Sequence, residues 1–241
     1  GKAEKIVLSK MVGYHHQLSH DWIRVFDLLC ANYPKAFVYL FASQASGVWM
    51  GATPELLINR EGADVQTIAL AGTKPVTSEG DWRPKEFVEQ NYVTKFIQEA
   101  LADCGVQNVT VSGPVSINAG QVVHLKTSFD FTFNQLKVGI WDLIDRLHPT
   151  PAVSGYPKDE AIGLIVSEEQ HDREYYAGYL GPVNSTELSL YVNLRCMKLT
   201  QDGAALFVGG GLTLDSDAEE EWNETDLKAQ TLMSVLQKID F

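Results

Sequence analysis

A stretch near the end of the chain, EEWNETDLKA (220–229), is rich in carboxylates. Within it Glu221, Glu224 and Lys228 stand three and seven positions apart, so a helix would place them along one stripe. Carboxylates on a face turned toward protein are costly unless something positive lies between them. Two of them about 4 Å apart repel by ~4 kcal/mol at an effective dielectric of 20. A divalent cation removes that penalty, and ligation by oxygens without Cys or His is typical of Mg²⁺.

The elements that would position these acids can be inferred from apolar periodicity. Residues 218–238 have the period of a helix, and the acidic stripe continues downstream as Val235 and Ile239. A stripe that turns apolar faces protein or a cleft, so we expect Glu221 and Glu224 to point inward. The apolar face itself is predicted to comprise Trp222, Ala229, Leu232 and Leu236.

A second predicted helix, residues 84–103, begins with a proline that suits the first helical position and also carries acids on its inner side. Its apolar face comprises Val93, Phe96, Ile97 and Ala100. Glu86 and Glu89 fall in the middle of that face. Glu86 complements the helix dipole in the first turn, whereas Glu89 lies a turn further in, where this explanation fades. The pattern predicts a magnesium site, although salt-bridged or partly exposed glutamates would explain it as well.

Further residues suit a bound carboxylate, and each has a simpler explanation. VGGGLT places three glycines at the end of a strand, where a ligand can approach backbone N–H groups or the chain can simply turn: Gly209, Gly210 and Gly211. LSLYVNLRCMKL reads as one strand on which Arg195 can clamp a carboxylate or form a surface ion pair. His124 on another strand can hydrogen-bond a ligand. His16 and His20 have a helical zinc spacing but no third ligand, which favours a solvated face.

Composition narrows the class of protein. The 241 residues carry a formal charge of −12, and no Lys/Arg cluster interleaved with aromatics appears, which argues against nucleic acid as a partner. Three scattered cysteines indicate a reducing cytoplasm, and no apolar run approaches a membrane span. The chain is already strand-like from Glu4, in EKIVLSK, and no linker divides it, which favours one domain, 1–241, that lacks an N-terminal segment.

The order of the elements predicts an α+β fold. Strand-like stretches with period-two alternation mostly follow one another, as in antiparallel sheets, and the helices are grouped. The predicted helices cover residues 14–33, 84–103, 136–147, 158–167 and 218–238.

Ten segments follow one another in order from Lys5 to the end of the chain: KIVLSK, GATPELLINR, LAGT, KEFVEQNYV, HLKTSF, HPTPAVSGYP, DREYYAGYLGPV, LRCMKL, LFVGGGL and EEWNETDLKA. Together they resemble the chorismate-utilising family of isochorismate, salicylate, anthranilate and aminodeoxychorismate synthases. The resemblance implies the chorismate-binding, aminodeoxychorismate synthase-like fold, in which two large antiparallel sheets pack together with helices outside.

The resemblance also implies a reaction on chorismate, in which a nucleophile adds at C2 while the C4 hydroxyl departs. Glu55 matches the acid that protonates the departing hydroxyl, and Lys5 matches the lysine that activates water. Such a lysine must be neutral, so burial or nearby positive charge should depress its pKa. Without the resemblance, Lys5 would be a solvated edge-strand residue and Glu55 a turn cap. Lysine rather than glutamine at position 5 is typical of the water-using branch, which needs no glutamine amidotransferase subunit, and predicts isochorismate synthase.

Other site residues follow from the same resemblance. Glu89 and Glu224 match the magnesium ligands, with Glu86 and Glu221 as partners in an outer shell or through water. Substrate-binding positions fall on Gly72, Thr73, His124, Arg195, Gly209, Gly210, Gly211 and Lys228.

Departures from the family pattern keep alternatives open. Gln90 replaces a common histidine, and Tyr176 and Leu194 resemble positions of salicylate synthases, which also eliminate pyruvate. YYAG resembles the menaquinone branch, which we favour over a siderophore pathway. An inactive chorismate-binding fragment is the alternative outside the enzymes, and the matched lysine and glutamates argue against it.

Overall fold

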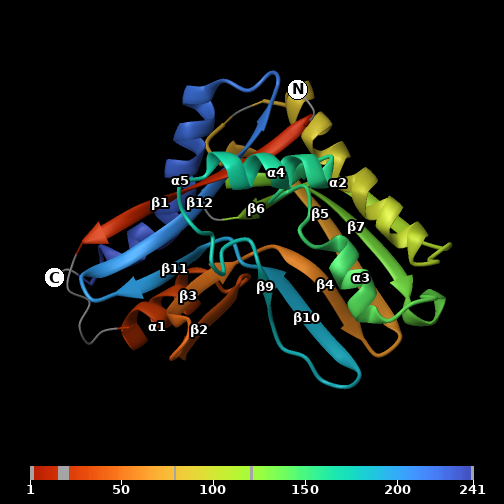
Figure 1. Cartoon of the computed structure of the whole chain (residues 1–241), viewed down its shortest axis with the longest axis horizontal. Coiled ribbons are helices and arrows are strands. Elements are labelled where there is room, and N and C mark those ends of the chain that lie inside the picture. Colours follow the sequence, from red (N-terminus) through yellow and green to blue (C-terminus); the bar gives the residue numbers. More distant parts are fainter. Residues whose placement is uncertain (1–2, 16–21, 79, 120–121, 240–241) are drawn as a thin grey trace.

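Two six-stranded antiparallel sheets form the framework of the computed structural model, which describes residues 3–15, 22–78, 80–119 and 122–239 (Figure 1). The first sheet has the order β2 (Phe37–Ser43), β3 (Gly47–Thr53), β11 (Cys196–Thr200), β12 (Gly203–Thr213), β1 (Lys5–His15), β8 (Gly155–Tyr156). The second has the order β6 (Thr110–Ala119), β7 (Val122–Thr132), β5 (Asp64–Pro75), β4 (Leu56–Glu61), β10 (Glu187–Val192), β9 (Tyr179–Leu180). The α+β prediction is therefore confirmed.

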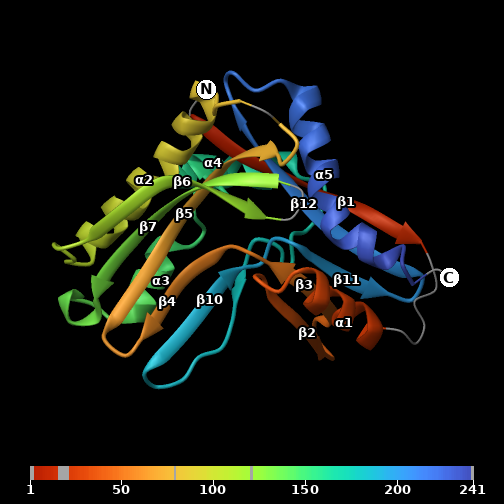
Figure 2. The same cartoon turned by 180° about the vertical axis from the view of Figure 1, so that it is seen from behind.

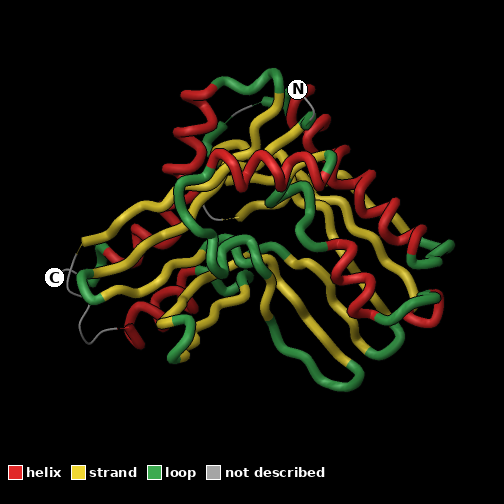
Figure 3. The backbone as a smooth tube through the Cα atoms, viewed as in Figure 1, coloured by secondary structure: helices red, strands yellow, loops and turns green. Residues whose placement is uncertain are grey.

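The helices lie outside the sheets, as predicted. They are α1 (Trp22–Asn32), α2 (Pro84–Asp103), α3 (Ile140–Leu147), α4 (Lys158–Glu168) and α5 (Ala218–Leu236), with a 3₁₀ turn at Phe133–Gln135. Helix α2 packs on β5 and β7, α4 on β1 and β8, and α5 on β12. Figure 2 shows α1 and α5 across one face of the first sheet, and Figure 3 shows the strands of the two sheets diverging. No helix in the described part of the chain is long and apolar enough to cross a membrane.

The middle of the first sheet is covered on both faces, which is why β3 is almost entirely apolar. Neighbouring Trp49 and Met50 on β3 point to opposite faces, and both are 0% exposed. Trp49 belongs to the core that joins the two sheets and α2, whereas Met50 packs in a second core beneath α1 and α5. The first sheet is therefore held in place by one core between the two sheets and by a second core beneath α1 and α5.

Two predicted elements are wrong in their bounds. The helix predicted over residues 14–33 starts only at Trp22, because β1 pairs with β12 as far as His15 opposite Gly203. Tertiary pairing overrides local propensity there; His16 and His20 lie outside the described residues. The helix predicted from residue 136 begins at Ile140, where the Asp142 carboxylate accepts a hydrogen bond from the backbone N–H of Gly139 at 2.8 Å.

The apparent single strand LSLYVNLRCMKL is two strands in different sheets. β10 ends at Val192 in the second sheet, and β11 begins at Cys196 in the first. Residues 193–195 cross between them, so Arg195 stands at the junction of the sheets rather than on a strand face. This crossing is one wall of the site described below.

The predicted apolar face of α5 also needs correction. Trp222 is 60% exposed, and its ring lies 3.4 Å beneath the Nζ of Lys10 on β1. The buried positions of the helix are Glu221, Thr225, Ala229, Leu232, Val235 and Leu236. The true inner face is therefore rotated toward Glu221, because β12 with its glycines lies under that side.

Candidate active site

Two adjoining cavities lie where the two sheets meet α2 and α5. The inner cavity, of about 60 Å³, is lined by Lys5, Glu55, Gly72, Thr73, Glu89, His124, Tyr176, Leu194, Arg195, Gly209, Gly211 and Lys228, among others. The carboxylate cavity, of about 20 Å³, is lined by Glu86, Glu89, Glu221 and Glu224 with Thr73, Lys85, Gly211, Thr213 and Ser216. Thr73, Glu89 and Gly211 line both, so the two cavities are neighbours. The residues predicted from the sequence, except Gly210, line one or both.

Glu55 stands in the link between β3 and β4 and is 6% exposed. Burial raises the pKa of its carboxyl to about 7, although the positive charges of Lys5, Arg195 and Lys228 oppose that rise. Near neutral pH a large fraction of Glu55 therefore holds its proton, as a general acid must. The alternative that it caps a surface turn is wrong, because the side chain faces the inner cavity.

Lys5 is the first residue of β1, between β12 and β8, and is 2% exposed. It is therefore not a solvated edge-strand residue. Its Nζ lies 2.8 Å from Oε1 of Glu89 on α2. Burial opposes ionisation of Glu89, but the charge and hydrogen bond of Lys5, with Lys228 and the N–H of Gly72, hold the pKa of Glu89 below its usual range.

His124 is buried in β7, opposite Thr73 of β5. Its Nδ1 lies 3.2 Å from the carbonyl oxygen of Gly72 and 3.2 Å from the Thr73 hydroxyl. Burial, helped by Arg195 and Lys228, lowers the pKa of His124 to about 3, so the ring is neutral and can bind a ligand only as a hydrogen-bonding group. Gly72 forms the irregularity between the two strands and has φ +65°, a conformation that favours glycine.

The glycine run lies near the end of β12, so the alternative that the chain simply turns there is wrong. Gly209, Gly210 and Gly211 pair with β1, but β11 stops at Cys196 opposite Phe207, so their other edge has no strand partner among the described residues. A Cβ on Gly209 would lie 2.5 Å from the Tyr176 hydroxyl, and one on Gly211 would lie 2.8 Å from Oε1 of Glu89. Gly210 faces α5 instead, where Thr225 is its neighbour.

Lys228 joins the inner cavity to α5. Its Nζ donates to the carbonyl oxygen of Gly209 at 3.0 Å and lies 2.6 Å from Oε1 of Glu224. Arg195, Lys228 and Lys5 thus bring three cationic groups to the wall of the inner cavity. Such a cavity suits a small dianion.

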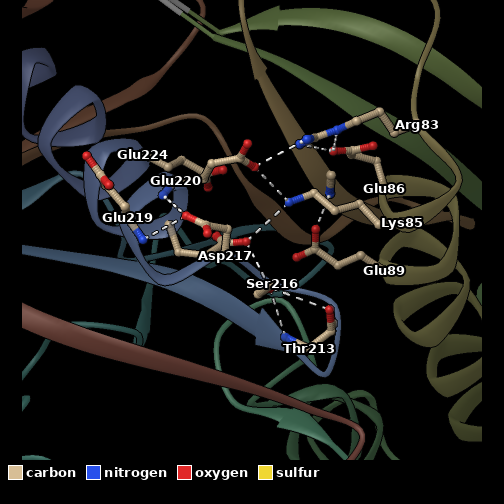
Figure 4. Close-up of polar contacts among 12 residues, drawn as sticks. Arg83, Lys85, Glu86, Glu89, Thr213, Ser216, Asp217, Glu219, Glu220 and Glu224 are labelled. Atoms are coloured by element: carbon tan, nitrogen blue, oxygen red, sulfur yellow. Dashed lines mark hydrogen bonds and ion pairs between the residues drawn. The ribbon is translucent and has the colours of Figure 1, made fainter.

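The carboxylate cavity separates the first two turns of α2 from those of α5. Figure 4 shows the acids of α5 facing those of α2, with Arg83 and Lys85 reaching between them. Arg83 contacts Glu220 at 3.2 Å, and Lys85 lies 3.4 Å from Glu221. Burial, and after it the charge of Glu224, raise the pKa of Glu221. The acids are therefore crowded and only partly neutralised.

The carboxylate cavity fits Mg²⁺ by the chemistry of its donors. Oε1 of Glu86 pairs with Arg83 at 2.9 Å, but the buried Oε2 has no hydrogen-bond partner among the described residues. Glu89 and Glu224 offer further oxygens, although each is held by a lysine. In the described part of the chain no three His, Cys, Asp or Glu side chains are arranged to hold a metal as they stand. The oxygens suit Mg²⁺, which retains water and substrate ligands, once the lysines release them.

Three contributors to the site were missed from the sequence. Arg83 and Lys85 bridge the two helices, and Asn193 is buried in the same crossing as Arg195. Lys85 directly precedes Glu86 and Arg83 stands three positions before it, which is a signal in the sequence. Nothing local marks Asn193, because its partners come from distant segments.

Comparison with known proteins gives a consistent result. The model of the chorismate-binding enzyme family matches residues 1–237. Isochorismate synthase EntC of Escherichia coli (strain K12) is 30% identical over 97% of this chain and 62% of its own length. Isochorismate synthase MenF of Bacillus subtilis (strain 168) is 32% identical over 82% of this chain and 44% of its own length. The chain thus spans less than two thirds of these relatives.

A solved structure resembles the whole fold. The menaquinone-specific isochorismate synthase MenF from Escherichia coli matches with a TM-score of 0.84 and 26% identity, covering 98% of this chain and 57% of that chain. Fold, cavity lining and family match agree, and the chain belongs to the family of chorismate-binding enzymes.

Proposed function

We propose that this protein is an isochorismate synthase that converts chorismate to isochorismate with Mg²⁺. The observation that carries the proposal is the inner cavity, where a buried carboxyl with a pKa near 7, Glu55, shares a wall with the buried amine of Lys5 and with cationic groups for the substrate carboxylates. The similarity to isochorismate synthases supports the same substrate.

The proposed reaction exchanges one hydroxyl for another without net loss of atoms. Lys5 in its neutral form takes a proton from water as the water oxygen bonds to C2 of chorismate. The ring double bonds shift, and the C4–O bond breaks while Glu55 delivers a proton to the departing hydroxyl, which leaves as water. General acid and base catalysis of this kind contributes ~10²–10⁴-fold for each positioned group.

The remaining residues orient the substrate. Arg195 and Lys228 hold its carboxylates, with backbone N–H groups of Gly209 and Gly211 beside them, and the neutral His124 and Thr73 contact the ring. Mg²⁺, held by Glu89 and Glu224 with Glu86 and Glu221 near it, would neutralise substrate carboxylate charge when bound. No amidotransferase subunit enters this reaction, because water is the nucleophile.

The test is chromatography of the products formed from chorismate and Mg²⁺ over time. Isochorismate appearing as chorismate disappears supports the proposal. Anthranilate formed efficiently from added ammonia would contradict the proposal that water is the nucleophile. Bound chorismate that is never converted would instead favour a chorismate-binding protein without turnover.

The second candidate is salicylate synthase, which adds elimination of pyruvate. Tyr176 and Leu194 line the inner cavity and are the observation that favours it. For the pathway we propose menaquinone synthesis over siderophore synthesis, supported by the similarity to MenF. The free thiols of Cys30, Cys104 and Cys196 support the proposal of a reducing, cytoplasmic location.

A further inference from the structure

Asn193 is a buried amide at the point where the chain crosses from the second sheet to the first. It is 2% exposed, and both the oxygen and the nitrogen of its side-chain amide form hydrogen bonds. Oδ1 accepts a hydrogen bond from the Tyr39 hydroxyl at 2.6 Å, and Nδ2 donates to the backbone carbonyl of Tyr175 at 2.8 Å. A buried amide is costly unless it is satisfied in this way, so the position is held by specific partners rather than by apolar packing.

The backbone of Asn193 fastens the crossing to the loop that carries Tyr176. Its N–H donates to the carbonyl of Gly178 at 2.8 Å, and its carbonyl accepts from the N–H of Ala177 at 2.8 Å. With the bond from Nδ2, three hydrogen bonds tie one residue to residues 175–178. The position of Tyr176 in the inner cavity therefore depends on Asn193.

Backbone hydrogen bonds on either side of Asn193 hold two further residues of the inner cavity, Glu55 and Arg195. The N–H of Val192 donates to the carbonyl of Glu55 at 2.9 Å. The carbonyl of Arg195 accepts from the N–H of Ala52 at 2.9 Å. Glu55 stands where the chain passes from β3 in the first sheet to β4 in the second, so the two connections between the sheets are hydrogen-bonded to each other beside the inner cavity.

Tyr39 on β2 anchors the crossing from the far side. It is buried and packs over Gly51, where an added Cβ would lie 2.8 Å from the Tyr39 ring and 2.7 Å from the carbonyl oxygen of Arg195. The bare backbone of Gly51 thus lets the ring and the crossing pack against β3 together. Tyr39 itself does not line the inner cavity, so it can influence the chemistry only through Asn193 and the packing.

We propose that Asn193, held by Tyr39, is a positioning residue for the inner cavity. Its hydrogen bonds set how the carboxyl of Glu55 stands relative to the guanidinium of Arg195 and the hydroxyl of Tyr176. The inference deepens the proposed function and rests on it for one of its two measurements.

The first measurement is the titration of the Glu55 carboxyl by ¹³C NMR in the ligand-free protein, assigned by its loss in Glu55→Gln. The charged groups that face Glu55 are Lys5 from β1, Arg195 from the crossing and Lys228 from α5, and Glu89 and His124 line the same cavity. Asn193→Ala loosens Arg195 and should raise the titration midpoint by about half a unit or more. Tyr39→Phe should move it in the same direction by less.

Thr67→Val is the matched control. Thr67 is 1% exposed in β5, and its hydroxyl donates to the carbonyl of Leu57 at 2.7 Å, away from the inner cavity. Thr67→Val, like Asn193→Ala and Tyr39→Phe, removes a buried side-chain hydrogen bond, and it should leave the titration midpoint of Glu55 unchanged. If Asn193→Ala does not fold, Tyr39→Phe carries the comparison alone.

The second measurement is turnover of chorismate. Asn193→Ala should lower kcat by about 10–100-fold and raise KM, because small displacements of reacting groups are costly, whereas Thr67→Val keeps both within about twofold. Midpoints and kinetics in Asn193→Ala and Tyr39→Phe that match Thr67→Val would overturn the inference. A wild-type protein without turnover would contradict the proposed function alone, since the titration uses no substrate.

Discussion

The inner cavity and the carboxylate cavity adjoin, yet they are built and charged in opposite ways. The inner cavity takes most of its side chains from strands and the links between them, and Lys5, Arg195 and Lys228 bring positive charge to its wall. The carboxylate cavity takes its acids from the first two turns of two helices, Glu86 and Glu89 on α2 and Glu221 and Glu224 on α5.

This difference predicts two kinds of ligand and two degrees of preorganisation. A cationic pocket suits a dianion, and an acidic one suits a divalent cation. The strand-borne groups are fixed by ladders and by close packing at Gly209 and Gly211. The helix-borne acids are held by long lysines and Arg83, so a cation must displace existing ion pairs, among them Lys5–Glu89. We therefore expect the inner cavity to be formed in advance and the carboxylate cavity to rearrange.

The largest effect should come from removing Lys5, the proposed base of the inner cavity. Lys5→Ala should lower kcat by ~10²–10⁴-fold, the usual contribution of a positioned general base. Lys10→Ala is the matched control, because Lys10 lies on the same strand and pairs with Asp226 at 2.7 Å outside both cavities. Steady-state kinetics with chorismate measure both. Near-wild-type turnover in Lys5→Ala would show that the amine is not the base.

The next effect concerns how the protonation of Glu55 changes the free energy of unfolding with pH. Its pKa is 4.5 when unfolded and about 7 when folded, so the folded state holds more protons between these values. The free energy of unfolding should therefore fall as pH rises from 4.5 through 7, by about 3 kcal/mol for this group. Glu55→Gln should remove that slope and raise stability above pH 7, as measured by urea unfolding across pH. Glu61→Gln, at the exposed end of β4, should keep the wild-type slope; an unchanged slope in Glu55→Gln would contradict the assignment.

A smaller effect is expected in the carboxylate cavity. Glu89→Gln and Glu224→Gln should each weaken Mg²⁺ binding by ~10–100-fold, by calorimetry on the protein without substrate, while the fold stays intact. Asp226→Asn is the control, since Asp226 lies on the outer side of α5. Equal Mg²⁺ affinity in all three variants would place the metal elsewhere. Glu89→Gln also releases Lys5, so a fall in turnover without a fall in affinity would mean that Glu89 acts only on Lys5.

Local patterns predicted the carboxylate cavity better than the inner cavity. The helical period is a local property, so it identified the inward placement of Glu86 and Glu89 before any partner was known. The strand order, and with it the split at residues 193–195, depends on pairing between distant segments. Periodicity could not show that β10 and β11 belong to different sheets.

Ion partners were also beyond the sequence. The resemblance placed Lys5 and Glu89 in one site, but only the structure pairs them. Trp222 was assigned inward because it is large and apolar, although Lys10 covers its ring at the surface. In each case the missing information is a contact between residues far apart in the chain.

The smallest effect separates isochorismate synthase from salicylate synthase. Both would use Lys5 and Glu55, so the wall of the inner cavity must decide whether the pyruvyl side chain folds over the ring for elimination. The Tyr176 hydroxyl lies against Gly209, where an added Cβ would stand 2.5 Å away, and it can hold a carboxylate. We expect isochorismate as the main product with at most slow release of salicylate. One hydrogen bond contributes ~0.5–1.5 kcal/mol, so Tyr176→Phe should change the product ratio only a few-fold, and Tyr175→Phe, which is 47% exposed, should not change it. Salicylate formed at the rate of chorismate loss, without an isochorismate phase, would show that the wild-type protein eliminates pyruvate. The protein would then be a salicylate synthase and not an isochorismate synthase.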